Sequence, residues 1–169
     1  GHSLDLGPTV ISSSSALQPG ELVCVTGASG FVGTHVVRAA LMSGLRVRGT
    51  VRNPNNTAKV AHLHAIASEL DAADRLELVA ADLMVEGSFD DALAGCNGLA
   101  HVAAVARFTA KDPQKDIVDP SVFGVANVYR SAAKAGSIRA IAHTSSVAAV
   151  QRIADARRGA VFNESDWNT

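Results

Sequence analysis

The chain has 169 residues, of which 47% are hydrophobic and only 4% aromatic, and its formal net charge is −1. This length suits a single domain with a sizeable core, and the near-neutral charge argues against a nucleic-acid or anionic-membrane partner. No apolar run approaches the roughly 18 residues of a membrane-spanning helix.

The start of the chain lacks any periodic apolar pattern. Gly1–Ser3 is typical of an expression-tag remnant, and residues 1–20 are expected to form a flexible leader before one domain over residues 21–169. The two cysteines, Cys24 and Cys96, fall in or beside expected buried strands. This placement favours free thiols and a reducing, cytoplasmic setting.

Short β-type runs alternate with longer helical runs along the rest of the chain. The runs expected as strands are Glu21–Thr26, Leu45–Val51, Leu76–Ala80, Gly98–Val102 and Arg139–Thr144. The helical runs between them are Phe31–Met42, Ala58–Leu70, Val85–Leu93 and Pro120–Ala135. Right-handed crossovers of this length predict an α/β fold, a doubly wound parallel sheet of the Rossmann type. Its ligands would bind beyond the carboxyl ends of the strands.

A glycine-rich turn, Thr26–Gly33, directly follows the first strand and opens the first helix. Its first glycine permits a tight turn, the middle one lets the backbone approach a pyrophosphate, and the last allows the helix to pack closely on the strand. The helix N-terminus then presents free N–H groups to the phosphates. A purely structural strand-to-helix turn is the alternative. The residues predicted to bind the cofactor here are Gly27, Ser29, Gly30, Phe31, Val32 and Gly33.

The glycine spacing, G-x-x-G-x-x-G, resembles that of the extended short-chain dehydrogenase/reductase superfamily, which includes the epimerases and dehydratases. Within it, the chain is most similar to the dihydroflavonol reductase, cinnamoyl-CoA reductase and microbial aldehyde reductase group. The matching stretches are Val47–Pro54, Asp82–Asp91, Gly95-Cys96 and Asn163–Trp167. The resemblance implies an NADPH-dependent reductase of a small carbonyl or aldehyde substrate.

The choice of cofactor depends on the end of the second strand. NAD-binding proteins usually place an acidic residue there for the ribose 2′-hydroxyl, whereas an arginine accommodates the 2′-phosphate of NADP. This chain has Arg52 there, followed by Lys59, and no acidic residue between Gly33 and Glu69. In the resembling reductases an Arg and a Lys in these positions hold the 2′-phosphate, so NADP (as NADPH) is the expected cofactor. Two solvated basic side chains are the alternative.

The resemblance also assigns roles at the ends of the later strands. Asp82 would accept a hydrogen bond from the adenine amino group, and Leu83 would add a backbone contact. The small residues Val102, Ala103 and Ala104 would lie beneath the ribose and nicotinamide of the cofactor. Thr144, Ser145 and Ser146 end the fifth strand, and Ser146 is the expected catalytic hydroxyl that hydrogen-bonds the substrate carbonyl.

One part of the family pattern is missing. Reductases of this type pair the serine with Tyr-x-x-x-Lys, but the only tyrosine here is Tyr129 and the residue four later is Ala133. We therefore expect a domain truncated before the C-terminal substrate-binding part and inactive by itself. The surface left open beside the fifth strand would favour a homodimer.

Two other functions share part of this pattern. A sugar-nucleotide epimerase or dehydratase domain would have the same glycine turn and serine, but such enzymes more often keep an acidic NAD-type residue where Arg52 stands. A non-catalytic NADP-binding module would need only the cofactor site. No metal site is expected, because His62 and His64 are two residues apart and would not share a helix face.

Overall fold

The computed structural model describes residues 16–105, 109–151, 161–163 and 165–167, so most of the leader expected over residues 1–20 lies outside the described residues. The strands are β1 (Leu22–Thr26), β2 (Arg46–Val51), β3 (Leu76–Ala80), β4 (Gly98–His101) and β5 (Ala140–His143). The helices are α1 (Phe31–Met42), α2 (Thr57–Glu69), α3 (Asp90–Leu93), α4 (Asp119–Ala135) and α5 (Val147–Val150). A 3₁₀ turn, η2 (Ala73–Arg75), precedes β3, and a π-helical turn, η3 (Gln114–Val118), precedes α4.

The five strands form one parallel sheet in the order β3-β2-β1-β4-β5. The chain runs outward from β1 to β3 and then crosses back to place β4 on the other side of β1. This reversal between β1 and β4 is the switch point at which ligands bind in doubly wound sheets. The observed order confirms the predicted fold class.

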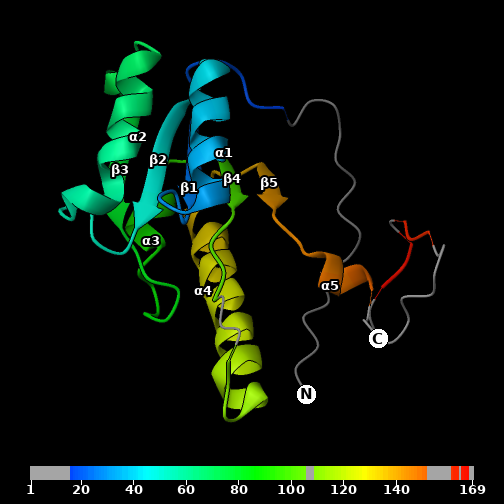
Figure 1. Ribbon diagram of the computed structural model, residues 1–169. Coiled ribbons are helices and arrows are strands. Elements are labelled where there is room, and N and C mark those ends of the chain that lie inside the picture. Colours follow the sequence, from blue (N-terminus) through cyan, green and yellow to red (C-terminus); the bar gives the residue numbers. More distant parts are fainter. Residues whose placement is uncertain (1–15, 106–108, 152–160, 164, 168–169) are drawn as a thin grey trace.

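Helices cover both faces of the sheet (Figure 1), because alternate strand residues point to opposite sides. Val23 and Val25 of β1 pack with residues of α1 and α2, including Val37 and Leu63. Cys24 of β1 belongs to a second cluster, which also contains residues of α3, α4 and β4. β1, buried over its whole length, forms the centre of the molecule.

The predicted helix over Val85–Leu93 was too long, because α3 covers only Asp90–Leu93. Gly87 has a φ of 73°, which a helix cannot contain. Ser88 closes the preceding segment on itself, donating from Oγ to the Asp82 carbonyl at 2.6 Å and accepting from the Asp82 N–H at 3.2 Å. We call residues 82–88 the 82–88 loop.

β5 is an edge strand of the sheet, and it is more exposed than β1 and β4. Ile141 on this strand keeps 42% of its surface exposed. Over the part of the chain that the structure describes, no helix is both long and apolar enough to cross a bilayer.

Candidate functional site

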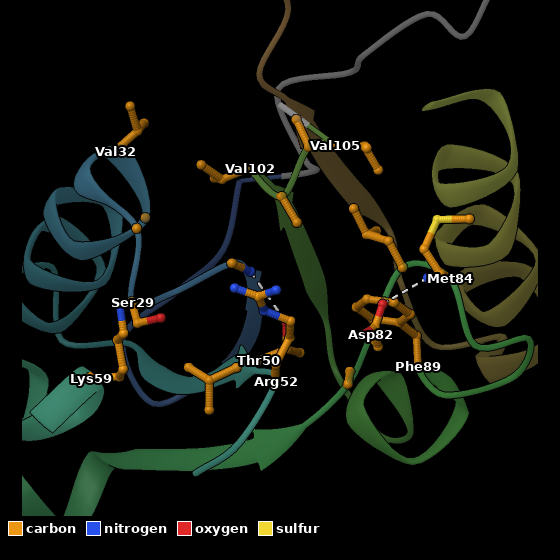
Figure 2. Close-up of a pocket in the computed structure, with 18 of the residues that line it drawn as sticks. Ser29, Val32, Thr50, Arg52, Lys59, Asp82, Met84, Phe89, Val102 and Val105 are labelled. Carbon is orange, nitrogen blue, oxygen red and sulfur yellow. Dashed lines mark hydrogen bonds between the residues drawn. The ribbon is translucent and has the colours of Figure 1, made fainter. Parts of the chain in front are cut away.

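An open cleft of about 760 Å³ lies where β1, β2, β3 and β4 end. Figure 2 shows Ser29 and Lys59 on one side of it and Asp82 on the other, with Arg52 between them. Among the predicted site residues, those lining the cleft are Gly27, Ser29, Gly30, Phe31, Val32, Gly33, Arg52, Lys59, Asp82, Leu83, Val102, Ala103 and Ala104. Four loops that are distant in sequence therefore meet at one place.

The glycine turn has the geometry that its spacing predicts. Gly27 has a φ of 66°, and a Cβ there would lie 3.0 Å from the Ala103 Cα. A Cβ on Gly33 would overlap the Gly27 carbonyl. Larger residues at either position would push the turn away from its neighbours, so both glycines keep the cleft open and the helix close to the strand.

The N-terminus of α1 faces this cleft without a neutralising group. Gly30 provides no side-chain cap, and the first turn contains no acidic residue. The unpaired N–H groups and the positive end of the helix dipole suit a phosphate.

Thr50, the second-last residue of β2, holds the glycine turn in place through two hydrogen bonds. Its Oγ1 accepts the Gly27 N–H at 3.2 Å, and its carbonyl accepts the Ala28 N–H at 3.0 Å. Thr50 is almost fully buried and also lines the cleft. Sequence reasoning gave no sign that Thr50 supports the turn, because a hydrogen bond between residues 23 positions apart leaves no local pattern.

Arg52 and Lys59 are both exposed on the cleft. No salt bridge within the described residues involves either side chain. Their two positive charges are therefore available to an anion that enters the cleft, and a guanidinium is well shaped to bind a phosphate with two hydrogen bonds.

Arg48, in the middle of β2, lies outside the cleft lining. Its Nε donates to Glu77 Oε2 at 2.8 Å, and its Nη1 donates to the Ala94 carbonyl at 2.8 Å. The same group also reaches the carbonyls of Asp91 and Ala92. The hydrogen bond to Glu77 raises the pKa of Arg48 although burial lowers it. Arg48 thus joins β2 to β3 and to the end of α3.

Asp82 begins the 82–88 loop, and one of its carboxylate oxygens already has a partner. Oδ1 accepts the Met84 N–H at 2.9 Å (Figure 2). No salt bridge within the described part of the chain involves this side chain. The carboxylate keeps acceptor capacity toward the cleft.

At the end of β4, the Thr26 hydroxyl organises the backbone. Thr26 Oγ1 accepts the N–H groups of Val102 and Ala103, both at 3.0 Å. These two residues line the cleft, whereas Thr26 itself is fully buried. β1 therefore fixes the floor of the cleft through one hydroxyl.

The three hydroxyl residues after β5 do not line this cleft. Thr144, Ser145 and Ser146 are exposed, and the Thr144 N–H donates to the His101 carbonyl at 3.0 Å. Ser146 Oγ accepts the Ala148 N–H at 3.2 Å and so caps α5. The structure places these residues beside the end of β4, without joining them to the cleft lining.

Tyr129 does not replace the missing tyrosine–lysine pair. It lies on α4, where its hydroxyl contacts His143 Nδ1 at 3.0 Å, and burial raises its pKa. Lys134, the nearest following lysine, is paired with Asp90 at 2.6 Å.

Among the described residues, no group of three or more His, Cys, Asp or Glu side chains could hold a metal ion.

Several other cleft-lining residues were not predicted from the sequence. Thr50 and Val51 directly precede Arg52, and Ala81 and Met84 flank the predicted pair Asp82-Leu83, so proximity in sequence could have indicated them. Val105 likewise follows the predicted residue Ala104, whereas Phe89 gave no such signal. The full set is Thr50, Val51, Ala81, Met84, Phe89 and Val105.

Comparison with known proteins places this chain in a family. Residues 23–161 match the NAD dependent epimerase/dehydratase family. Cinnamoyl-CoA reductase CAD2 of Medicago truncatula is 42% identical over 158 residues, which is 93% of this chain and 47% of that protein. Dihydroflavonol 4-reductase of Callistephus chinensis is 42% identical over 146 residues, covering 86% of this chain and 39% of that protein.

A solved structure agrees with these sequence matches. Gre2 of Candida albicans, determined in complex with NADPH, superposes with a TM-score of 0.75 at 31% identity, over 88% of this chain and 44% of that one. The chain thus spans less than half the length of each of these three proteins. The resemblance inferred from the glycine turn and the later strand ends is confirmed, and the chain belongs to the NAD dependent epimerase/dehydratase family.

Proposed function

We propose that this chain is the cofactor-binding part of an NADPH-dependent reductase of carbonyl or aldehyde compounds. The observation that carries the proposal is that Arg52 and Lys59, which form no salt bridge within the described residues, lie on a cleft bounded on one side by the glycine turn. The absence of any acidic residue between Gly33 and Glu69 supports NADP over NAD.

The residues of the cleft fit such a cofactor. The free N–H groups at the start of α1 would bind the pyrophosphate, and Arg52 with Lys59 would bind the 2′-phosphate. Asp82 would accept from the adenine amino group, and Val102, Ala103 and Ala104 would support the nicotinamide half. When bound, the cofactor would supply hydride to a carbonyl carbon.

Ser146 is proposed as the catalytic hydroxyl, which would donate a hydrogen bond to the substrate carbonyl oxygen. In this structure its Oγ is occupied as the acceptor of the Ala148 N–H, which leaves its own proton free to donate. A tyrosine and a lysine of a Tyr-x-x-x-Lys pair would protonate that oxygen and hold the ribose, and this chain contains no such pair.

The reading frame that encodes this chain tests the reductase proposal. It should continue beyond Thr169 into a segment containing Tyr-x-x-x-Lys. The protein encoded by this reading frame should oxidise NADPH when simple aldehydes or ketones are added. Ser146→Ala should slow that oxidation by about 10²-fold. A frame without this pair would contradict the reductase and leave a non-catalytic NADP-binding module as the second candidate.

A further inference from the structure

The 82–88 loop, which carries Asp82 and Leu83 into the cleft, is attached to α4 by one buried side chain. Asn127 lies in the middle of α4 and is only 1% exposed. Its Nδ2 donates to the carbonyls of Leu83 at 3.1 Å and Val85 at 2.8 Å. Its Oδ1 accepts the Gly87 N–H at 3.0 Å.

This carboxamide fits its surroundings in one orientation only. The two carbonyl oxygens require the amide nitrogen on their side, and the Gly87 N–H requires the oxygen on the other. Both N–H bonds of the side chain and one lone pair are thereby used. A loop of irregular backbone next to an open cleft depends on such contacts to keep one conformation.

A second feature of α4 brings the same loop close. Gly124, one turn before Asn127, is buried, and a Cβ there would lie 3.2 Å from the Leu83 Cβ. Residues three apart share a helix face. Gly124 and Asn127 therefore form one contact surface on α4, against which the loop residues 83–87 rest.

We propose that Asn127 is a positioning residue for the adenine half of the dinucleotide. The proposal rests on the proposed function, since it assumes that Asp82 and Leu83 contact the adenine. Asn127 is not among the residues that line the cleft. It acts by holding the Leu83 and Val85 carbonyls and the Gly87 N–H, so that the Asp82 carboxylate and the Leu83 backbone keep their places.

The test uses three probes with this chain: NADPH, 2′-phospho-ADP-ribose as the adenine half, and reduced nicotinamide mononucleotide as the other half. Asn127→Ala should weaken binding of NADPH and of the adenine half by about tenfold, the equivalent of losing one or two net hydrogen bonds. Binding of the nicotinamide half should not change. The preference for NADPH over NADH should also stay, because Arg52 follows β2 and Lys59 lies at the start of α2, both outside the 82–88 loop.

Two further variants separate positioning from general damage. Ser131→Ala is the matched control, because Ser131 is also buried on α4 but its hydroxyl donates to Asp90 Oδ1 of α3 at 2.6 Å and not to the backbone of the 82–88 loop. It should leave binding of all three probes unchanged. Gly124→Ala should favour the helix, since alanine is the better helix former. It should nevertheless weaken binding of the adenine half by a few-fold, because the added Cβ would lie 3.2 Å from the Leu83 Cβ and displace Leu83.

The outcomes distinguish the two proposals. If the unaltered chain binds no NADPH, the proposed function fails. If the unaltered chain binds NADPH but a folded Asn127→Ala binds the adenine half as tightly, the positioning role is wrong. An equal loss of affinity for the adenine half and for the nicotinamide half would also overturn the positioning role. Should Asn127→Ala not fold, Gly124→Ala decides: unchanged binding of the adenine half then contradicts the role assigned to this surface of α4.

Discussion

Thr26 Oγ1 and His101 Nδ1 lie 2.8 Å apart, across the point where β1 and β4 diverge. The same oxygen accepts two backbone N–H groups, from Val102 and Ala103, so its own proton is left for the histidine. His101 is therefore the acceptor at Nδ1 and carries its proton on Nε2. One hydroxyl thus joins the start of the glycine turn to the end of β4.

Replacing Thr26 tests the strength of this link. Thr26→Val keeps the shape but removes the oxygen, so two backbone N–H groups and His101 Nδ1 lose their partner. We expect a loss of about 1–3 kcal/mol in the free energy of unfolding, measured by urea denaturation. Thr26→Ser keeps the hydroxyl and should cost only about 1 kcal/mol for the lost methyl group. Equal losses in the two variants would mean that the hydroxyl is unimportant.

His101 should make the stability of the chain depend on pH. Burial, and secondarily the neighbouring His143, lowers the pKa of His101 to about 4. The unfolded chain takes up the proton near pH 6.5, whereas the folded chain stays neutral until about pH 4. Stability is therefore full above pH 6.5 and falls as the pH drops toward 4, by up to roughly 3 kcal/mol.

The groups that face His101 within the described part of the chain are Thr26, His143 and Tyr129, none of which is a carboxylate. Urea denaturation at pH 7, 5.5 and 4.5 should show this fall in the unaltered chain, and His101→Asn should reduce it. An identical fall in the variant would assign the acid sensitivity to other groups.

Arg48 and Arg52 are only four residues apart, but Arg48 should contribute to stability and Arg52 to cofactor binding. Arg48→Met removes the ion pair with Glu77 and the bonds to the end of α3. We expect it to lower the free energy of unfolding by about 1.5–3 kcal/mol, as is usual for bonds to a charged group. The ratio of NADPH to NADH affinity should remain that of the unaltered chain. A changed ratio would place Arg48 at the cofactor.

The exposed edge beside β5 should make this 169-residue chain self-associate. Ile141 is 42% exposed on a strand whose outer edge has no partner strand within the described residues. Light scattering should show concentration-dependent dimers, and Ile141→Lys should shift the chain toward monomer. Met42→Lys, at a 68% exposed position on the far end of α1, is the control and should not change the association. A monomer at all concentrations would contradict this expectation.

Much of the fold could be predicted because its signals are local. β1 reads as five consecutive buried residues between Pro19-Gly20 and Gly27, and Gly136 ends α4 with a φ of 66°. The length of the helix that ends at Leu93 was overestimated, because the sequence does not show the positive φ of Gly87 that excludes this residue from the helix.

The cleft was predictable in part for the same reason. The glycine turn and Arg52 stand next to strand ends, where ligands bind. Thr50 and Asn127 were not predicted as supports of the cleft, because their bonds reach 23 and more than 40 residues along the chain. Such partners become visible only when the sheet and α4 are assembled.

The relative affinity for NADPH and NADH tests the central claim most directly. Titration of the unaltered chain should show tighter binding of NADPH, and Arg52→Asp should reverse the order, with a change of about tenfold to a hundredfold. Arg46→Asp is the matched control, because Arg46 is exposed at the opposite end of β2 and makes the same change of charge. It should keep the preference for NADPH. Equal affinity of the unaltered chain for the two cofactors, or a preference that survives Arg52→Asp, would contradict the assignment of this cleft to NADP.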